Sequence, residues 1–340
     1  MSSSLVIQTS FLGDTVLTTP LLAQLANRGP VDVVATPASA ALLANHPAVR
    51  TIVAYDKRGE DRGLIGFWRL AQRLRANRYD IALLAQGSWR SAALALVAGI
   101  PARIGFDTSS GRLLYSKRVP YRDDLHHAAR LLMLARPNGR EPLPEELRPS
   151  LAPGQRERDD VDRLLDAAGV LAGERLVGVA PGSVWGTKRW PYYPELATEL
   201  TGAARIVVLG SAGDAELAKS IVLAAPDAID ATGQLSLLAS AELVRRCAVL
   251  VTNDSAPLHL ASAMETPTVA IFGPTVPEFG FGPLAPRASV VGRDGLPCRP
   301  CDRHGPQRCP LGHFRCMREL TPALVAERVR ALLLNPDVLA

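Results

Sequence analysis

Three polar residues, Asn253, Asp254 and Ser255, follow an apolar run that is typical of a buried strand, and a helical pattern containing His259 comes next. Such side chains cap helices, and Pro257 suits a first helical turn because its missing N–H would be unpaired there. The pattern predicts a helix that begins at the carboxyl end of a strand, with free N–H groups and a positive dipole end that could bind an anion. The alternative is that Asp254 is only a cap and His259 only a helix-surface residue.

A second loop has the residue types that hold a diphosphate. Residues 177–191 read as a strand followed by Pro-Gly, two hydroxyls at Ser183 and Thr187, and the cation Lys188. Hydroxyls, a lysine and helix N-termini can neutralise a leaving pyrophosphate. A further strand-to-helix junction places Asp214 where it could meet a ribose hydroxyl. Neither the Walker P-loop nor the Gly-x-Gly-x-x-Gly pattern is present, which disfavours an ordinary NTPase or dehydrogenase.

A carboxylate in the first half of the chain could act as a general base. Asp14 follows the strand predicted over residues 5–9 and begins the helix predicted over 14–27. A carboxylate there can remove the proton of an attacking hydroxyl, which typically contributes ~10²–10⁴ in rate. The alternative is a helix cap, because Asp is among the best capping residues.

The positive charge is concentrated in the first half. The chain has a net charge of +5, and residues 1–150 hold 19 Lys and Arg against 12 Asp and Glu. Much of the excess lies in one cluster: Lys57, Arg58, Arg62, Arg69, Arg73, Arg75 and Arg78. The cluster could face an anionic membrane, an acidic substrate or nucleic acid, or be a solvated helix face. Nucleic acid is the weakest option because no nucleic-acid-binding motif accompanies the charge.

The elements that position these residues form two series of alternating strands and helices, separated by a Pro- and charge-rich passage over 137–160. The alternation is typical of parallel sheets covered by helices. The predicted strands lie near 5–9, 31–35, 51–55, 80–86 and 103–106, then near 176–180, 205–209, 228–231, 248–252 and 268–272. We therefore expect an α/β fold with two Rossmann-like, doubly wound domains facing each other across a cleft. Their predicted bounds are 1–160 and 161–320, followed by a C-terminal helix within 321–340 that could cross back to the first domain.

The cysteines are unevenly distributed. Cys247 reads as a core residue, whereas four others crowd into a short loop with His304 and His313: Cys298, Cys301, Cys309 and Cys316. The four thiols could form a structural zinc site, or the loop could pack them without metal. The N-terminus has no basic start and no stretch has the ~20 apolar residues of a membrane helix, so we expect a cytoplasmic protein.

Five segments together resemble glycosyltransferase family 9, the heptosyltransferases of lipopolysaccharide core assembly, and in particular its heptosyltransferase II members. The segments are FLGDTVLTTP, PGSVWGTKRWP, LGSAGDAE, TNDSAPLHLASA and FGPTVPEFGFGP, and their order and spacing span nearly the whole chain. The resemblance implies a GT-B fold, with the first domain binding the acceptor and the second the nucleotide sugar. It also implies an ADP-heptose donor, inversion at the anomeric carbon and no catalytic metal.

The resemblance also assigns roles. Asp14 would be the base, and Lys188 would assist the leaving group. Donor-binding residues would be Ser183, Thr187, Lys188, Asp254, Ser255 and His259 at the diphosphate, with Asp214 at the ribose and Leu235 at the adenine. The family commonly has Gly after the Asp-Ser/Thr pair, whereas Ala256 and Pro257 follow here, so one backbone N–H is missing.

The resemblance thus implies transfer of heptose from ADP-heptose to the heptose–Kdo inner core on lipid A. Arg58, Arg62 and Arg69 would bind the anionic acceptor, and the basic cluster would dock the enzyme peripherally on the cytoplasmic face of the inner membrane. The alternatives are heptosyltransferase I, a transferase for another core sugar, and a non-catalytic module that binds a sugar nucleotide or zinc.

Overall fold

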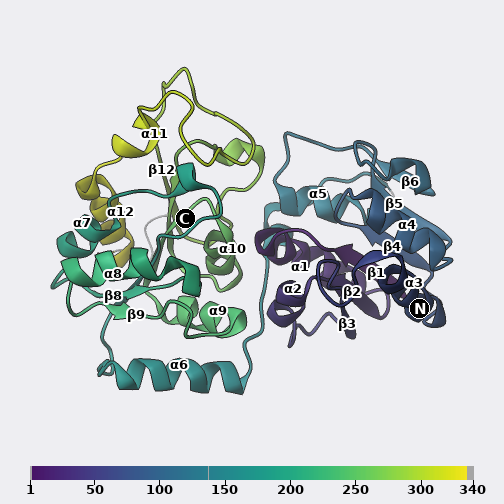
Figure 1. Cartoon of the computed structure of the whole chain (residues 1–340), viewed down its shortest axis with the longest axis horizontal. Helices are drawn as coiled ribbons and strands as arrows, with labels where there is room; N and C mark the ends of the chain where they lie inside the picture. The colour runs from purple at the N-terminus through teal and green to yellow at the C-terminus, as the bar shows by residue number, and fades with distance from the viewer. Residues whose placement is uncertain (1, 137, 335–340) are drawn as a thin grey trace. The chain divides into compact units, whose positions relative to one another are not determined.

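The computed structural model describes residues 2–136 and 138–334 (Figure 1). The chain divides into two compact units between Ala152 and Pro153. The sequence places this change at residue 160, which lies inside a helix. Residue 137 of the Pro-rich passage and residues 335–340 of the predicted C-terminal segment lie outside the described residues.

Within the described residues, the first unit is built on one six-stranded parallel sheet. Its strands are β1 (Ser4–Gln8), β2 (Val31–Ala35), β3 (Thr51–Ala54), β4 (Ile81–Leu84), β5 (Ala102–Phe106) and β6 (Lys117–Val119). Its α-helices are α1 (Leu12–Ala26), α2 (Pro37–Leu42), α3 (Gly63–Ala76), α4 (Trp89–Val97) and α5 (His127–Met133). Two short 3₁₀ helices are η1 (Arg112–Leu114) and η2 (Pro144–Leu147).

The second unit repeats this plan in the part of the chain that the structure describes. Its strands are β7 (Leu176–Ala180), β8 (Arg205–Val208), β9 (Ile229–Asp230), β10 (Val249–Asn253), β11 (Thr268–Phe272) and β12 (Ala288–Gly292). Its α-helices are α6 (Gln155–Ala167), α7 (Tyr193–Glu199), α8 (Ala215–Ala224), α9 (Leu237–Arg246), α10 (Ala256–Ala263), α11 (Arg315–Arg318) and α12 (Pro322–Leu334). The 3₁₀ helices are η3 (Gly186–Lys188), η4 (Ala212–Asp214) and η5 (Pro277–Phe279).

The two sheets have the same winding. The strand order is β3-β2-β1-β4-β5-β6 in the first sheet and β9-β8-β7-β10-β11-β12 in the second, with every pair parallel. When the strands of each unit are numbered from one, both orders are 3-2-1-4-5-6. Each sheet therefore reverses its strand order once, between β1 and β4 and between β7 and β10. Open α/β sheets bind ligands outside the carboxyl ends of the strands at such a switch point. The expectation of two doubly wound α/β sheets is confirmed.

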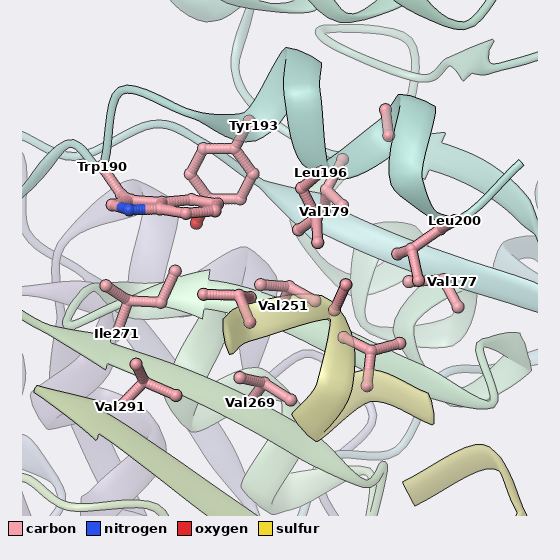
Figure 2. Packing of buried hydrophobic residues seen from close by; sticks show 14 of the residues in the cluster. Val177, Val179, Trp190, Tyr193, Leu196, Leu200, Val251, Val269, Ile271 and Val291 are labelled. Carbon is pink, nitrogen blue, oxygen red and sulfur yellow. The ribbon is translucent and has the colours of Figure 1, made fainter. Parts of the chain in front are cut away.

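Apolar cores on both faces of the second sheet hold these strand ends in place. Alternate residues of β7 and β8 point to opposite faces, so Val177 and Val179 join one cluster while Leu176 joins the other. The first cluster is covered by α7, α8 and α12, and the second by α6, α9 and α10. Figure 2 shows Trp190, Tyr193 and Leu196 packed over Val179, Val251 and Ile271 in the first cluster.

Several local features differ from the expectation. Helix α1 begins at Leu12, with Phe11 as its N-cap, so Asp14 lies within the first turn and does not cap the helix. Helix α5 was not predicted, because six consecutive residues are buried and leave no amphipathic period. The short elements β6, β12 and α2 were also missed. Helix α12 belongs to the second unit: Val325, Ala326 and Val329 are buried in the cluster that α7 covers, which corrects the suggestion that this helix crosses back.

Candidate active site

The carboxylate of Asp14 lies at the switch point of the first sheet. The loop after β1 leads into α1, and Ser10 in that loop donates a hydrogen bond from Oγ to Asp14 Oδ2 at 2.6 Å. The same hydroxyl is within 2.6 Å of Gln8 Oε1, at the end of β1. Thr9 donates to Gln86 Oε1, which follows β4, so the loops on both sides of the switch point are joined. The Asp14 side chain is 20% exposed and is therefore held in place while remaining accessible.

A histidine that the sequence analysis did not single out lies beside this carboxylate. His127, the first residue of α5, places Nε2 3.8 Å from Asp14 Oδ1. Burial lowers the pKa of His127, the Asp14 carboxylate acts in the opposite direction, and Arg130 lowers the pKa further. The imidazole is thus predominantly neutral at pH 7. The missed α5 explains why the sequence did not reveal this pair.

Cations gather at the same edge of the first sheet. Lys57 Nζ donates to the carbonyl oxygen of Thr9 at 3.1 Å, next to the loop that positions Asp14. Burial lowers the pKa of Lys57, and Arg58 and Arg90 add to the effect, which shows that three cations are close to one another. Arg58 and Arg62 are exposed in the segment before α3, whereas Arg69 lies on the exposed side of α3 itself. The sequence analysis did not single out Arg90, because no recognisable motif surrounds it.

In the second unit, a buried ion pair lies at the switch point. Lys188 Nζ donates to Asp254 Oδ2 at 2.6 Å, which joins the loop after β7 to the residue after β10. Thr275 donates from Oγ1 to the same oxygen at 2.6 Å. The side chains of Lys188 and Asp254 are only 10% and 9% exposed. Lys188 is therefore oriented by a carboxylate that is itself held by a hydroxyl, an arrangement that fixes the direction of the ammonium group.

Buried side chains anchor the loop that carries Lys188. Asn253 donates from Nδ2 to the carbonyl of Pro181 at 2.9 Å, and its Oδ1 accepts from the Trp190 N–H and from the Tyr193 hydroxyl, each at 3.2 Å. The indole N–H of Trp190 donates to the carbonyl of Leu320 at 2.8 Å. Asn253 thus holds both ends of the loop. The sequence indicated a polar cap at this position but not this role.

Arg299 fixes the other strand end at this site. Its guanidinium donates to the carbonyl oxygens of Gly273, Phe272 and Thr275 at 2.8, 3.2 and 3.3 Å, respectively. These carbonyls belong to the end of β11 and the loop that follows. Since Thr275 contacts Asp254, Arg299 indirectly positions the ion pair. Arg299 has no local signal in the sequence, because its three partners lie 24–27 positions earlier in the chain.

Ser183, Asp214 and Ser255 surround the start of the same loop. Asp214 accepts from the N–H and Oγ of Ser211 at 2.9 and 2.8 Å, and its carboxylate packs directly against Gly182, where a Cβ would lie 2.5 Å from Oδ1. Ser255 is the N-cap of α10, and its hydroxyl is 3.5 Å from the carbonyl of Gly182. The hydroxyl of Ser183 accepts from the Trp185 N–H at 3.3 Å. The structure thus brings these three residues together around Gly182.

The remaining predicted donor residues are placed differently. Thr187 is buried and donates its hydroxyl to the carbonyl of Pro306. His259 is buried on α10, with its ring 6.3 Å from that of Phe281. Leu235 is half-buried against the core cluster under α9. The Thr187 hydroxyl thus contacts the cysteine-rich loop.

The cysteine-rich loop packs on the Lys188 loop. Gly186 donates its N–H to Gln307 Oε1 at 3.1 Å, and Gln307 Nε2 donates to the carbonyl of Val184 at 3.0 Å. The rings of Trp185 and His304 stack with centroids 5.9 Å apart. The loop after β7 is therefore supported from outside by residues more than a hundred positions later in the chain.

The four clustered cysteines are the candidate zinc ligands. Among residues 2–136 and 138–334, no three His, Cys, Asp or Glu side chains are placed to hold a metal ion. Cys298 Sγ lies 3.8 Å from His313 Nε2, while Cys316 is buried in the core, where burial raises the pKa of its thiol to about 11. Cys298, Cys301 and Cys309 also raise the pKa of Cys316, which places the four thiols near one another, and a structural zinc stays a prediction. Cys247 is buried, as predicted.

Comparisons with known proteins identify the family. The family model for glycosyltransferase family 9 (heptosyltransferase) matches residues 67–310. The chain belongs to glycosyltransferase family 9. It is therefore a glycosyltransferase, and its two doubly wound units are those of the GT-B fold.

The relatives cover almost the whole chain. The lipopolysaccharide heptosyltransferase 2 of Salmonella typhimurium is 31% identical, over 98% of this chain and 99% of its own length. The lipopolysaccharide heptosyltransferase 1 of Pseudomonas aeruginosa is 30% identical, again over 98% and 99%. The solved structure of E. coli ADP-heptose LPS heptosyltransferase II has a TM-score of 0.80 at 27% identity and covers 99% of this chain and 100% of that one.

Proposed function

We propose that this chain transfers heptose from ADP-L-glycero-β-D-manno-heptose to the heptose of the heptose–Kdo inner core of lipopolysaccharide, with inversion at the anomeric carbon. Membership of family 9 and the names of its relatives support the donor and the acceptor class. The observation that carries the proposal is the placement of Asp14: a carboxylate at a switch point, oriented by Ser10 and still accessible.

In this proposal Asp14 is the general base. An acceptor hydroxyl gives its proton to the carboxylate as its oxygen forms a bond to the anomeric carbon, and the bond from that carbon to the ADP oxygen breaks with its electron pair on ADP. Attack from the side opposite the leaving group inverts the configuration. Ser10 orients the carboxylate, and the imidazole of His127 lies near it, with Nε2 3.8 Å from Oδ1.

Lys188 and the start of α10 receive the leaving diphosphate. A lysine ammonium has three N–H donors, and Asp254 takes one of them, so two are available for phosphate oxygens. Ser183, Ser255 and the positive end of the α10 dipole add donors at the same strand ends. This arrangement stabilises the departing charge with the chain's own groups and needs no metal. Full activity in the presence of a chelator is the expected result, and loss of activity would contradict it.

The rest of the donor would bind around the same strand ends. We assign Asp214 to the ribose hydroxyls, because it lies at the carboxyl end of β8 and packs on Gly182. Leu235 is assigned to the adenine and His259 to the diphosphate, as the family resemblance implies. Thr187 would also shape the loop, through its bond to Pro306.

The cations of the first unit would bind the acceptor. Lipid A and Kdo carry phosphates and carboxylates, which Arg58, Arg62 and Arg69 would attract along the edge that holds Asp14. We also propose that the enzyme acts at the cytoplasmic face of the inner membrane as a peripheral protein. Within the described residues, no helix combines the length and hydropathy needed to cross a bilayer.

One experiment tests the reaction. The purified protein is incubated with ADP-heptose and with lipid A–Kdo acceptors that carry zero, one or two heptoses. The masses of the products are measured by mass spectrometry. Extension of the one-heptose acceptor alone is expected. Extension of the heptose-free acceptor would instead indicate the heptosyltransferase 1 reaction, which the Pseudomonas aeruginosa relative favours as the second candidate. ADP binding without extension of any acceptor would indicate a transferase for another core sugar.

A further inference from the structure

The first half of α3 exposes an unusual set of large apolar side chains. Leu64, Ile65 and Trp68 are 85%, 77% and 56% exposed. Residues three and four apart are neighbours on a helix surface, so Trp68, four residues after Leu64 and three after Ile65, joins the three into one patch. The opposite side of the helix is already used, because Leu70 and Leu74 are buried in the core of the first unit. The exposed patch is therefore not needed to pack α3 on its sheet.

The patch lies at the carboxyl edge of the first sheet, the same edge that holds Asp14. Helix α3 follows β3, and α4 follows β4 with Trp89, another exposed aromatic residue, at its first position. Arg90 connects the two helix starts: Nη2 donates to the carbonyl of Gly63 at 3.3 Å, and its guanidinium lies 5.8 Å from the ring centre of Phe67. In Figure 1 the labels of α3 and α4 appear on the same unit as β1 and β4. Trp89 is thus an exposed aromatic residue at the start of the neighbouring helix.

The charges around this patch are mostly positive. Helix α3 contains Arg69, Arg73 and Arg75 and no acidic residue, and Arg62 is its N-cap. Arg69 and Arg73 lie about 6 and 12 Å farther along the helix axis than Ile65. The exposed apolar side chains thus lie at the start of α3, and the arginines lie farther along the same helix.

The acidic residues near the patch do not neutralise the positive charge of α3. Asp56 accepts the N–H groups of Arg58 and Gly59 at 3.2 and 2.8 Å, and Asp61 accepts the N–H of Asp56 at 3.0 Å. These two carboxylates are bound within their own loop. Glu60 is the exposed acid of this segment. The segment before α3 is therefore close to neutral, and the excess positive charge lies on the helix.

We propose that the start of α3, together with Trp89, inserts into the surface of an anionic lipid bilayer. Leu64, Ile65 and Trp68 enter the boundary between headgroups and acyl chains, while the arginines bind lipid phosphates. Interfacial helices bury their apolar side about 5–10 Å into the boundary between headgroups and acyl chains and carry Lys and Arg on the polar side, as the start of α3 does. A protein partner fits less well, because a standard interface needs about 20–30 residues a side and this patch is much smaller.

This inference rests on the proposed function, since insertion would bring Asp14 close to an acceptor that is anchored in the membrane. It differs from docking by charge alone, because it requires the apolar side chains. The consequence is that vesicle binding should be sensitive to both salt and the loss of apolar surface.

The test uses the whole protein and vesicles of phosphatidylcholine, with or without phosphatidylglycerol. Binding is measured by flotation for the wild type, for Leu64→Ser/Ile65→Ser/Trp68→Ser, and for the matched control Leu171→Ser/Leu223→Ser, which removes exposed apolar residues from the second unit. The wild type and the control should bind vesicles that contain phosphatidylglycerol, and the triple variant should bind roughly tenfold or more weakly. Equal binding by the triple variant, or no preference for the anionic lipid, would overturn the proposal.

Two further measurements separate this inference from the proposed reaction. Transfer to a water-soluble acceptor without acyl chains should be the same for the wild type and the triple variant, and vesicle binding should be the same for the wild type and Asp14→Asn. If the wild type binds vesicles but transfers no heptose, the proposed function fails and the membrane inference stands. If the patch instead holds a second copy of the chain, the wild type will dimerise without lipid and the triple variant will not, which would also overturn the proposal.

Discussion

The two sheets have the same strand order, but the groups at their switch points are held in different ways. In the first unit Asp14 is 20% exposed, and its partners are one hydroxyl and a nearby neutral imidazole. In the second unit Lys188 and Asp254 are half as exposed or less and form a closed set with Thr275. One fold thus supports an open carboxylate at one site and a preorganised cation at the other.

The difference matches the chemical demands of the two roles that we propose for these sites. A base must be reached by a bulky hydroxyl-bearing acceptor, so burial would obstruct it. A group that stabilises the charge of a leaving diphosphate works best when it is fixed and shielded from water before the reaction. The first unit therefore provides access and the second provides rigidity, and the following changes test this contrast.

The largest effect is expected from Asp14→Asn. The amide keeps the shape of the side chain but cannot accept a proton, so kcat should fall by about 10²–10⁴ while ADP affinity stays unchanged. Turnover and calorimetric titration with ADP measure the two quantities. Glu145→Gln, which neutralises an exposed carboxylate of the same unit, is the control and should leave both values unchanged. A modest loss for Asp14→Asn would remove it from the role of base.

The next effect is expected from Lys188→Met. It leaves the buried Asp254 carboxylate without its cation, which should destabilise the second unit by about 3–5 kcal/mol and strongly weaken ADP binding. Adding Asp254→Asn to this variant should restore stability but not ADP binding, since the phosphate donor is still missing. Lys219→Met, at an exposed position of α8, is the matched control. If ADP affinity returned in the double variant, Lys188 would be structural only.

Thr275→Val tests the preorganisation more finely. It removes one hydrogen bond to Asp254 without changing any charge, so the free energy of unfolding should fall by about 1 kcal/mol and the donor KM should rise. Thr198→Val, an exposed threonine on α7, serves as the control. An unchanged donor KM with lowered stability would show that the hydroxyl supports the fold and not donor binding.

The smallest effect concerns pH and the first unit. Burial lowers the pKa of both His46 and His127, so the unfolded chain takes up protons at a higher pH than the folded unit does. The free energy of unfolding is therefore highest above the unfolded-state histidine pKa of about 6.5. It falls as the pH drops from there toward the lower pKa values of the folded state. Hydrogen exchange should therefore show the first unit losing protection below this pH. His46→Gln should flatten the dependence, and an unaltered profile in that variant would contradict the assignment.

Local patterns in the sequence predicted most of the fold, and they failed where the pattern was weak. Strands such as Leu176–Ala180 and Thr268–Phe272 were predicted because both faces of a parallel sheet are buried and leave continuous apolar runs. Helix α5 was missed because it is buried all round, and β6 because it has only three residues. The start of α1 was predicted two residues late, since Asp14 resembles a cap.

The candidate site followed the same rule. Residues such as Asp14, Lys188, Asp214 and Asp254 could be proposed from the sequence because each lies in a polar stretch that follows an apolar run. His127, Thr275 and Arg299 could not be found this way, because each acts through a partner far away in the chain. The hydroxyl of Thr187 bonds to the carbonyl of Pro306, a contact that no local pattern encodes, and its role at the diphosphate stays a prediction.

The sequence by itself determined the alternation of strands and helices, and with it which loops lie at carboxyl strand ends, because burial period and capping chemistry are local properties. Only the tertiary structure decided which of these side chains meet. The pairing of Lys188 with Asp254 spans 66 positions, and the support of the Lys188 loop by Gln307 spans 121. Such contacts depend on the order of the strands in the sheet, which is set by the packing of the whole unit and not by any single segment.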